Sequence, residues 1–333
     1  MKVMAGDVGG TKTLLQIAEV GDGRIEVLHQ KHFLSQEYPD FESLLRDYLA
    51  DAPAALCTGI DSACFGVAGP VSDAEQGNRR ARVTNLPWDI DEAKLRTLLQ
   101  AARVRLINDF CATASGIAAL GPDDLAVLNP GSPQSRAPRL VIGAGTGLGV
   151  AQLLWSEGRY RAFPSEGGHI HFAPTDALQM ELLAYLQKRY GRVAYERVVS
   201  GGGLVNIYSF LHQRVQDADA ANLQSILASP DSAAAITALA HSDDPLARQA
   251  VSLFVSIYGA IAGDLALLTL AHGGVYVAGG IAPKLLHEMH AGMFMEAYLH
   301  KGRMSPLVKQ MPVFIVLAKD VGVRGATLVA FQL

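Results

Sequence analysis

Near its amino end the chain reads Gly6-Asp7-Val8-Gly9-Gly10-Thr11-Lys12, between the apolar pair Val3-Met4 and the extended stretch 13–18. This order predicts a strand, a glycine turn and a second strand, with bare backbone N–H groups and one carboxylate at the hairpin tip. Such a tip suits phosphate groups and a hydrated Mg²⁺. The residues alone leave a second interpretation open, a plain hairpin turn whose glycines only supply positive φ angles.

A second hairpin of the same design lies in the middle of the chain. Leu140-Val141-Ile142 leads into the loop Gly143-Ala144-Gly145-Thr146-Gly147-Leu148-Gly149 and out through the apolar stretch 150–155. Neither loop closes with the Gly-Lys-Ser/Thr of a Walker loop, and the second lacks the Gly-x-Gly-x-x-Gly spacing of a dinucleotide fold. Two such hairpins indicate two half-molecules that face one nucleotide.

Composition limits the class of protein. A chain of 333 residues, half of them hydrophobic, suits two lobes better than one core. The net charge of −4, without a dense Lys/Arg run, gives little support to nucleic-acid binding. The cysteines at 57, 64 and 111 form neither an even disulfide set nor a Cys-x-x-Cys pair, which favours a reducing cytosol and no structural zinc. Functional sequence begins too early for a signal peptide, so we expect a cytoplasmic protein.

The stretch 251–271 is apolar enough to cross a membrane, and Gly259 and Gly263 have the spacing of a helix-pairing motif. Asp264 lies inside this stretch, where a charge near a bilayer centre costs about 2.5–3.5 kcal/mol. We therefore expect a buried core helix and no membrane contact, with the glycines allowing another element to pack closely.

Strands and helices of mixed order indicate an α/β fold. In the first lobe we expect strands near 2–6, 13–19, 24–34, 60–67 and 103–107, and helices near 40–50 and 91–101. In the second lobe we expect a helix near 110–120, the hairpin at 140–155, a mostly helical run over 175–272, a strand at 275–278, a helix from near Pro283 and a strand at 313–318. A terminal helix around 321–332 follows.

Several motifs resemble one superfamily. The Asp-x-Gly-Gly-Thr turn at 7–11, the Gly-x-Gly-Thr-Gly turn at 143–147 and Gly279-Gly280 are similar to the phosphate and adenosine motifs shared by sugar kinases, actin and heat-shock chaperones. Within that superfamily, the segments 106–110 and 165–174, together with 195–201, resemble the ATP-dependent bacterial glucokinases of the proteobacterial type. The match covers nearly the whole chain, in matching order.

The resemblance implies a two-lobed, actin-like (ribonuclease H-like) α/β fold with mixed sheets flanked by helices and an active site in the cleft between lobes. The small α/β domain is expected at 1–109 plus 319–333, and the large α/β domain at 110–318.

Asp109 is the candidate catalytic residue. It follows the apolar strand at 104–107 and opens a helix, so that its carboxylate lies at the end of a rigid element. Position alone favours a plainer interpretation, in which Asp109 or Asn108 is simply the N-cap of that helix. The resemblance implies that Asn108 and Asp109 bind the sugar and that Asp109 takes the proton from its 6-hydroxyl.

Glu166, His169 and Glu196 are the other candidate sugar-binding residues that the resemblance implies. Carboxylates and an imidazole can hold several hydroxyls that both donate and accept. The residues alone leave open an exposed Glu-Gly-Gly-His turn with a structural histidine. His171 receives no role.

The resemblance implies a nucleotide site made by both hairpins and the late glycine pair. Its candidate residues are Gly6, Asp7, Val8, Gly9, Gly10, Thr11, Gly145, Thr146, Gly147, Gly279 and Gly280. Asp7 is expected to steer Mg²⁺, through water. Lys12 is as readily a solvated lysine as a catalytic one, and Asn85 and Gly69-Pro70 rank below the five sugar candidates.

The predicted activity is ATP-dependent transfer of the γ-phosphate to the 6-hydroxyl of glucose, giving glucose 6-phosphate and ADP, an entry step to glycolysis. The expected ligands are ATP, Mg²⁺ and glucose, and the resemblance implies a homodimer. Two alternatives are a kinase of another hexose, such as fructose, mannose or an N-acetylated sugar, and a sugar-binding regulator without catalysis. The kinases of the related repressor family carry a cysteine-rich zinc segment, which this chain lacks. The sugar regulators of that family add an amino-terminal DNA-binding domain; with six residues before Asp7 we expect none here, which favours the metabolic enzyme.

Overall fold

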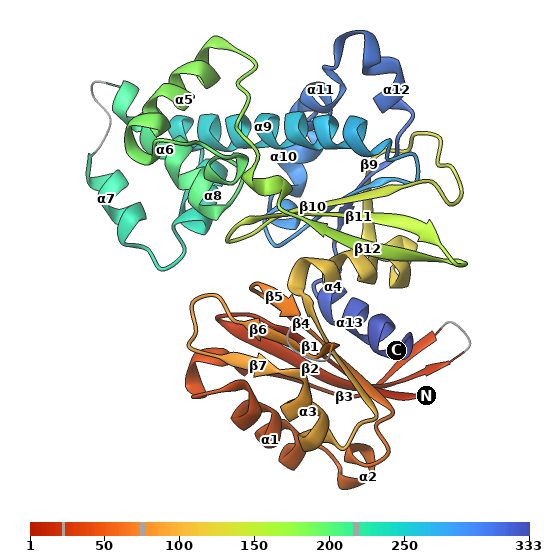
Figure 1. The fold of residues 1–333 in the computed structure, drawn as a ribbon. Helices are drawn as coiled ribbons and strands as arrows, with labels where there is room; N and C mark the ends of the chain where they lie inside the picture. The colour runs from red at the N-terminus through yellow and green to blue at the C-terminus, as the bar shows by residue number, and fades with distance from the viewer. Residues whose placement is uncertain (22–23, 74–76, 216–219) are drawn as a thin grey trace. The chain divides into compact units, whose positions relative to one another are not determined.

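The computed structural model describes residues 1–21, 24–73, 77–215 and 220–333, which fold into two compact units (Figure 1). The first unit comprises Met1–Pro122, Ser156–Pro164 and Ala318–Leu333; the second comprises Asp123–Trp155 and Ser165–Leu317. The domain boundaries expected at 109/110 and 318/319 stay a prediction. The expected helical run over 175–272 includes residues 216–219, which lie outside the described residues.

The first unit is built on a five-stranded sheet in the order β3-β2-β1-β4-β8. Its strands are β1 (Lys2–Val8), β2 (Lys12–Gly21), β3 (Arg24–Leu34), β4 (Ser62–Val67) and β8 (Arg103–Asn108). β1 pairs antiparallel with β2 and parallel with β4, and β4 pairs parallel with β8. Every residue of β4 is buried, as expected for a central parallel strand covered on both faces.

Helices cover both faces of this sheet (Figure 1). They are α1 (Phe41–Asp51), α2 (Ala54–Cys57), α3 (Glu92–Leu99), α4 (Asp109–Gly116) and α13 (Val321–Phe331), with short 3₁₀ turns η1 (Ser35–Glu37) and η3 (Ile117–Ala119). Alternate residues of β1 enter different cores: Met4 packs with α1 residues, whereas Val3 and Ala5 pack with α13 residues. α4 and α13 cross closely because Gly325 has no side chain, and a Cβ there would meet the Ala112 carbonyl oxygen at 1.8 Å.

A small antiparallel sheet in the first unit was not expected from the sequence. It contains β5 (Val71–Asp73), β6 (Arg79–Arg82) and β7 (Asp89–Asp91) in the order β5-β6-β7. Its strands are three or four residues long and mostly polar, so they carry little period-two signal.

The other large sheet has the order β12-β11-β10-β13-β14-β9, and all of its strands except β12 lie mainly in the second unit. Its strands are β9 (Leu125–Asn129), β10 (Arg139–Ala144), β11 (Leu148–Ser156), β12 (Arg159–Ser165), β13 (Val275–Ala278) and β14 (Val313–Val316). β10 pairs antiparallel with β11 and parallel with β13. The arrangement repeats that of β1 with β2 and β4, so the expectation of two hairpins of one design is confirmed.

The remaining helices belong mainly to the second unit. They are α5 (Ala177–Tyr190), α6 (Gly201–Arg214), α7 (Ala220–Ala228), α8 (Ser232–His241), α9 (Pro245–Thr269), α10 (Leu286–His290), α11 (Met293–Leu299) and α12 (Ser305–Lys309), with 3₁₀ turns η4 (Pro122–Asp124), η5 (Gly167–His169), η6 (Tyr195–Arg197), η7 (Ala282–Leu285) and η8 (Gly302–Met304).

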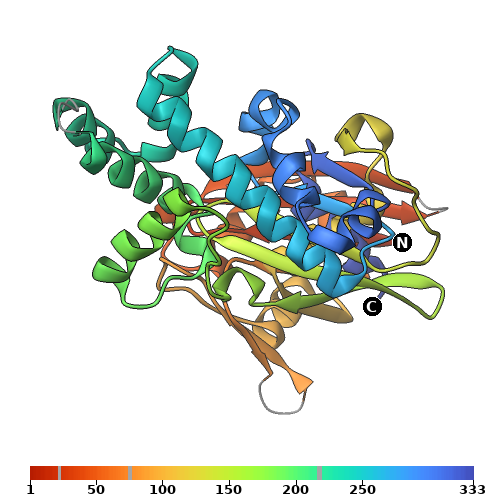
Figure 2. The same ribbon diagram turned by 90° about the horizontal axis from the view of Figure 1, so that it is seen from above.

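α9 is the long helix of the second unit (Figure 2), and most of it is buried in the core. It is long and apolar enough to cross a membrane. Its glycines, however, allow α11 to pack closely against it. A Cβ at Gly259 would meet the Phe294 carbonyl oxygen at 2.1 Å, and one at Gly263 would meet the Tyr298 carbonyl oxygen at 2.4 Å. Asp264 forms an ion pair with Lys301 at 2.7 Å. The expectation of a core helix is confirmed.

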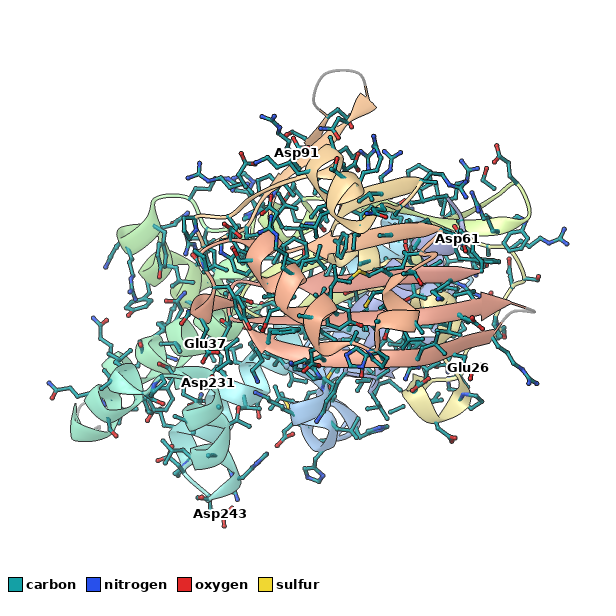
Figure 3. The ribbon with its side chains drawn as sticks, turned by 90° about the horizontal axis from the view of Figure 1, so that it is seen from below. Glu26, Glu37, Asp61, Asp91, Asp231 and Asp243 are labelled. Atoms are coloured by element: carbon teal, nitrogen blue, oxygen red, sulfur yellow. The ribbon has the colours of Figure 1, made fainter. Side chains whose placement is uncertain are left out.

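Acidic side chains are spread over separate elements of the chain (Figure 3). Two of those labelled have clear structural tasks. Asp91 caps α3 by accepting from the Ala93 and Lys94 N–H groups, and Asp61 accepts from the Lys2 N–H at 2.9 Å. Both tasks are local and contribute to the folding of the first unit.

Candidate active site

Three strands of the first unit end at one edge of its sheet. The parallel ladders align Val8 of β1 with Val67 of β4, and Val67 with Asn108 of β8. Side chains at the carboxyl ends of adjacent parallel strands meet at the same edge of a sheet. Asp7 and Asp109 are therefore neighbours, although about a hundred residues separate them in the sequence.

Asp7 and Asp109 influence each other electrostatically, and both are half-buried. Burial, with a smaller contribution from the Asp109 charge, raises the pKa of Asp7 to about 7. Burial also raises the pKa of Asp109, although hydrogen bonds to its carboxylate, including one from the Phe110 N–H at 2.8 Å, oppose this shift. The edge thus holds two carboxylates whose environment favours the protonated forms.

Asn108 is the N-cap of α4. Its Oδ1 accepts from the Phe110 N–H at 2.9 Å and the Cys111 N–H at 3.3 Å, and its Nδ2 donates to the Gly69 carbonyl at 3.4 Å. The capping interpretation is therefore correct for Asn108, while Asp109 is the first residue of the helix. Capping fixes the backbone at Asn108 and therefore also the position of the adjacent Asp109 Cα, from which its carboxylate extends.

The tip of the first hairpin is partly closed by its own hydrogen bonds. Gly9 donates its N–H to the Lys12 carbonyl at 3.0 Å, so this predicted phosphate donor is engaged in the turn. Gly10 and Thr11 lie at the tip, and Thr11 is exposed. Gly6 is buried in β1, where a Cβ would meet Leu15 at 2.6 Å, and Val8 is also buried. Gly6 and Val8 thus pack the strand that carries Asp7.

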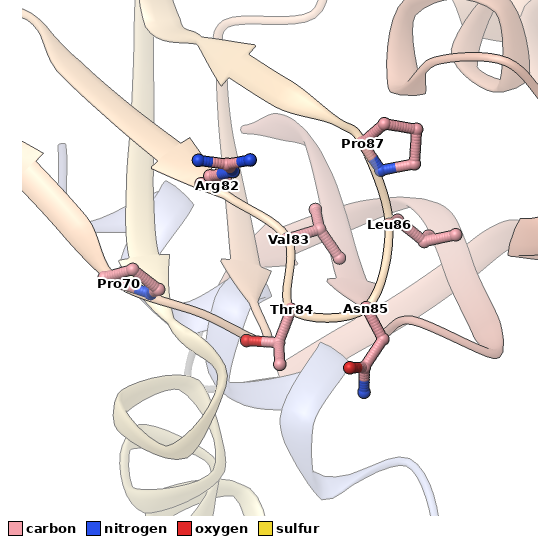
Figure 4. A pocket seen from close by; sticks show the side chains of 7 residues that line it. All are labelled: Pro70, Arg82, Val83, Thr84, Asn85, Leu86 and Pro87. Carbon is pink, nitrogen blue, oxygen red and sulfur yellow. The ribbon is translucent and has the colours of Figure 1, made fainter.

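A pocket of about 460 Å³ lies in the first unit (Figure 4). Its lining residues are Pro70, Arg82, Val83, Thr84, Asn85, Leu86 and Pro87. The Thr84 N–H donates to the Ala68 carbonyl at 2.8 Å, and a Cβ at Gly10 would meet the Thr84 carbonyl oxygen at 2.7 Å. Asn85 is exposed with φ of 66°, a conformation that Asn tolerates better than most residues. This loop thus packs directly against the first glycine turn.

In the second unit, the second glycine turn and the late glycine pair are brought together. Gly145 donates its N–H to the Gly147 carbonyl at 2.9 Å, which closes the turn, and Thr146 at its tip is exposed. Gly279 has φ of 83°, and a Cβ there would meet the Ala144 carbonyl oxygen at 2.4 Å. Gly280 is exposed, and a Cβ there would meet nothing within 4 Å. Both turns follow strands paired in register, so the expected grouping is present within this unit.

The predicted sugar residues of the second unit come from two segments that are joined. The Tyr195 N–H donates to the Ile170 carbonyl and the Phe172 N–H to the Val193 carbonyl, both at 3.0 Å. Glu166 and His169 lie on the first segment, with His169 Nε2 and Glu166 Oε2 3.7 Å apart and the side chains 54% and 89% exposed. Glu196, half-buried on η6, accepts from the Leu148 N–H at 3.0 Å. The backbone of His171 forms an isolated antiparallel β-bridge with Ala194.

Two close approaches of a glycine to a carboxylate were not foreseen: Gly322 was not among the candidates, and Gly147 was assigned only to the nucleotide. Gly322, at the start of α13, faces Asp7: a Cβ there would meet Asp7 Oδ2 at 2.6 Å. Gly147 faces Glu196 in the same way: a Cβ at Gly147 would meet Glu196 Oε2 at 2.5 Å. No local pattern marks either approach, because each joins elements far apart in the sequence.

The family model described as Glucokinase matches residues 4–333. A curated glucokinase of Nostoc punctiforme is 40% identical, with 99% of each chain covered. The crystal structure of a glucokinase from an Antarctic psychrotroph has a TM-score of 0.84 at 27% identity, covering 100% of this chain and 99% of the other. A Streptomyces griseus ROK family glucokinase, solved with glucose and AMPPNP, has a TM-score of 0.65 at 20% identity, covering 100% of both, and so shows the fold. The chain therefore belongs to the glucokinase family and is an ATP-dependent enzyme that phosphorylates glucose.

Proposed function

We propose that Asp109 is the general base of this kinase and accepts the proton of the glucose 6-hydroxyl as the γ-phosphate is transferred. The observation that carries the proposal is the placement of a half-buried carboxylate, with a raised pKa, at the carboxyl edge of three parallel strands. A base is most effective when its pKa lies near the working pH, and burial moves Asp109 in that direction. The capped start of α4 holds it on a rigid element.

The sugar is held by Asn108, Glu166, His169 and Glu196 in this proposal. Their carboxylate, amide and imidazole groups offer acceptors and donors that match ring hydroxyls. A site built on such bonds discriminates strongly against a sugar that lacks one hydroxyl, because the partner group is then left unpaired. The Streptomyces griseus relative binds glucose and an ATP analogue, which supports the same pair of substrates here.

Asp7 fits a role in steering a hydrated Mg²⁺. It is one of two adjacent half-buried carboxylates whose ionised forms disfavour each other, and a divalent cation offsets that repulsion. Among the described residues, no set of three His, Cys, Asp or Glu side chains is placed to chelate an ion directly. This matches an ion that keeps most of its waters and is held mainly by nucleotide phosphates. When bound, Mg²⁺ supplies neutralisation of phosphate charge.

The test of the base is Asp109→Ala, assayed by coupled production of glucose 6-phosphate and by calorimetric titration with glucose. We expect kcat to fall by about 10²–10⁴-fold while glucose still binds. A variant that phosphorylated glucose as fast as the parent would show that another group takes the proton.

The test of the sugar site is a panel of kcat/KM values for glucose, fructose, mannose and N-acetylglucosamine at saturating MgATP. Glucose should give the highest value, and Glu166→Gln should lower it for glucose. Equal values across the panel would contradict recognition by individual hydroxyls.

We also propose that the enzyme is a cytoplasmic homodimer, as the family resemblance implies. Light scattering coupled to size-exclusion chromatography should give twice the chain mass of 35.4 kDa. A single-chain mass at micromolar concentration would contradict the dimer.

A further inference from the structure

Leu148, the first residue after the second glycine turn, contacts both sugar-binding segments through its backbone. Its N–H donates to Glu196 Oε2 at 3.0 Å. Its carbonyl oxygen would lie 2.0 Å from a Cβ at Gly168, so the segment with Glu166 and His169 packs directly on it. The backbone of one residue, Leu148, therefore links the turn assigned to the nucleotide with the residues assigned to the sugar.

Gly147 is the residue that permits this arrangement. The Glu196 carboxylate lies over its Cα, and a Cβ at 147 would come within 2.5 Å of Oε2 and 3.3 Å of Cδ. The atoms in the way are the free end of a side chain, which can move, and no backbone atom comes within 4 Å of the added Cβ. An added methyl group would therefore displace the carboxylate and leave the fold intact.

We propose that Gly147 is a positioning residue for the Glu196 carboxylate, and that the Gly147–Leu148 backbone couples sugar affinity to nucleotide affinity. The proposal rests on the assignment of Glu196 to the sugar site. One carboxylate oxygen is held by the Leu148 N–H, and the second is then aimed at a sugar hydroxyl. A nucleotide that orders the second glycine turn also orders the Glu196 carboxylate and so favours sugar binding. By reciprocity, a bound sugar must favour nucleotide binding by the same factor.

Gly145 provides a matched control in the same turn. A Cβ at Gly145 would meet nothing within 4 Å, and its φ does not lie in the left-handed region, so alanine fits there without moving Glu196. Gly145→Ala and Gly147→Ala thus make the same chemical change two residues apart, and only the second touches the carboxylate.

The first arm of the experiment measures glucose affinity by calorimetry without nucleotide. Gly147→Ala should weaken glucose binding by about tenfold, the loss of one well-aligned hydrogen bond to a charged group. Gly145→Ala should match the parent, and all three proteins should unfold at similar temperatures. In a Glu196→Ala background, Gly147→Ala should have no further effect. Unchanged glucose affinity in Gly147→Ala, or equal losses in both glycine variants, would overturn the proposal.

The second arm measures MgADP affinity without sugar, so it remains informative if Gly147→Ala does not fold. Glu196→Ala removes the acceptor for the Leu148 N–H and should weaken MgADP binding by about threefold, whereas Glu196→Gln keeps an acceptor and should resemble the parent. Equal MgADP affinity in the parent and Glu196→Ala would overturn the coupling. If the parent protein failed to bind glucose, the sugar assignment would fall while this arm still decided whether Glu196 orders the turn.

Discussion

The two glycine hairpins share a backbone plan but differ in how each obtains a carboxylate. In the first unit, Asp7 is part of the hairpin strand and faces a second carboxylate, Asp109. In the second unit, the turn has no acidic residue, and Glu196 reaches it from η6 to accept a backbone N–H. A carboxylate beside another carboxylate is suited to a cation, whereas one fixed by an N–H donor is suited to hydroxyls. We therefore propose that one backbone plan serves two different ligand chemistries.

The largest effect expected from this difference is in Asp7→Asn. Removing its charge should lower kcat/KM for MgATP by roughly 100-fold, because metal and phosphate charge is then stabilised less in the transition state. Glucose affinity without nucleotide should remain near that of the parent. Initial rates over a range of free Mg²⁺ give the measurement, and a variant with unchanged Mg²⁺ dependence would place the cation elsewhere.

The strand and glycine pattern was enough to predict both hairpins, because apolar runs bounded by Gly clusters are local signals. Strands β1, β2, β4, β8, β10 and β13 all lie within a few residues of their expected positions. The core helix α9 was likewise evident from its length and composition. The family resemblance identified the candidate sugar-binding residues, because their local patterns by themselves are also typical of ordinary turns and helix caps.

The sequence did not predict contacts between residues that are distant along the chain and meet only in the fold. Nothing near Gly322 or Gly147 indicates that each faces a carboxylate, and only the folded chain brings Asp7 within reach of α13. Gly9 and Gly145 looked like free phosphate donors, yet each closes its own turn by a backbone hydrogen bond. The short strands β5, β6 and β7 carry too few residues for a period to be read.

The second effect is on stability and its pH dependence. The folded-state pKa of Asp7, about 7, lies above its ordinary value of 3.8. Between about pH 4 and pH 7 the unfolded chain releases a proton that the folded protein keeps, so the free energy of unfolding falls as pH rises. Asp7→Asn should remove the contribution of Asp7 to this decline, so the difference in free energy of unfolding between variant and parent should grow by on the order of 4 kcal/mol from pH 4 to pH 8.

Urea unfolding of the parent and of Asp7→Asn without ligands, at several pH values, tests whether the free energy of unfolding falls as pH rises. Asp109 has a shift in the same direction, so Asp109→Asn should also flatten the profile and, by removing a like charge, lower the pKa of Asp7. A parent protein whose stability rose steadily from pH 4 to pH 7 would contradict the burial of an unpaired Asp7 carboxylate.

A smaller effect is expected from Gly322→Ala, the counterpart of Gly147→Ala. The added Cβ would lie 2.6 Å from Asp7 Oδ2, which is again the movable end of a side chain. We expect the KM for MgATP to rise about tenfold at most, with glucose affinity unchanged. Combining it with Asp7→Ala should remove the effect, because no carboxylate is left to displace. A rise in the KM for glucose instead would contradict separate tasks for the two hairpins.

The smallest effects should come from the two threonines at the hairpin tips. Thr11 is the last residue of the turn 9–11, and Thr146 is the middle residue of the turn 145–147. Both are exposed, so each is expected to contribute one neutral hydrogen bond to the phosphates. Such a bond is worth about 1 kcal/mol, so Thr11→Ala and Thr146→Ala should each raise the KM for MgATP by about threefold to tenfold, and Thr→Ser should restore it. Because the tips are separate, the double variant should show the sum of the two free-energy costs. If only Thr11 mattered, the shared backbone plan of the hairpins would not imply shared contacts with the nucleotide, and the second turn would act chiefly through Glu196.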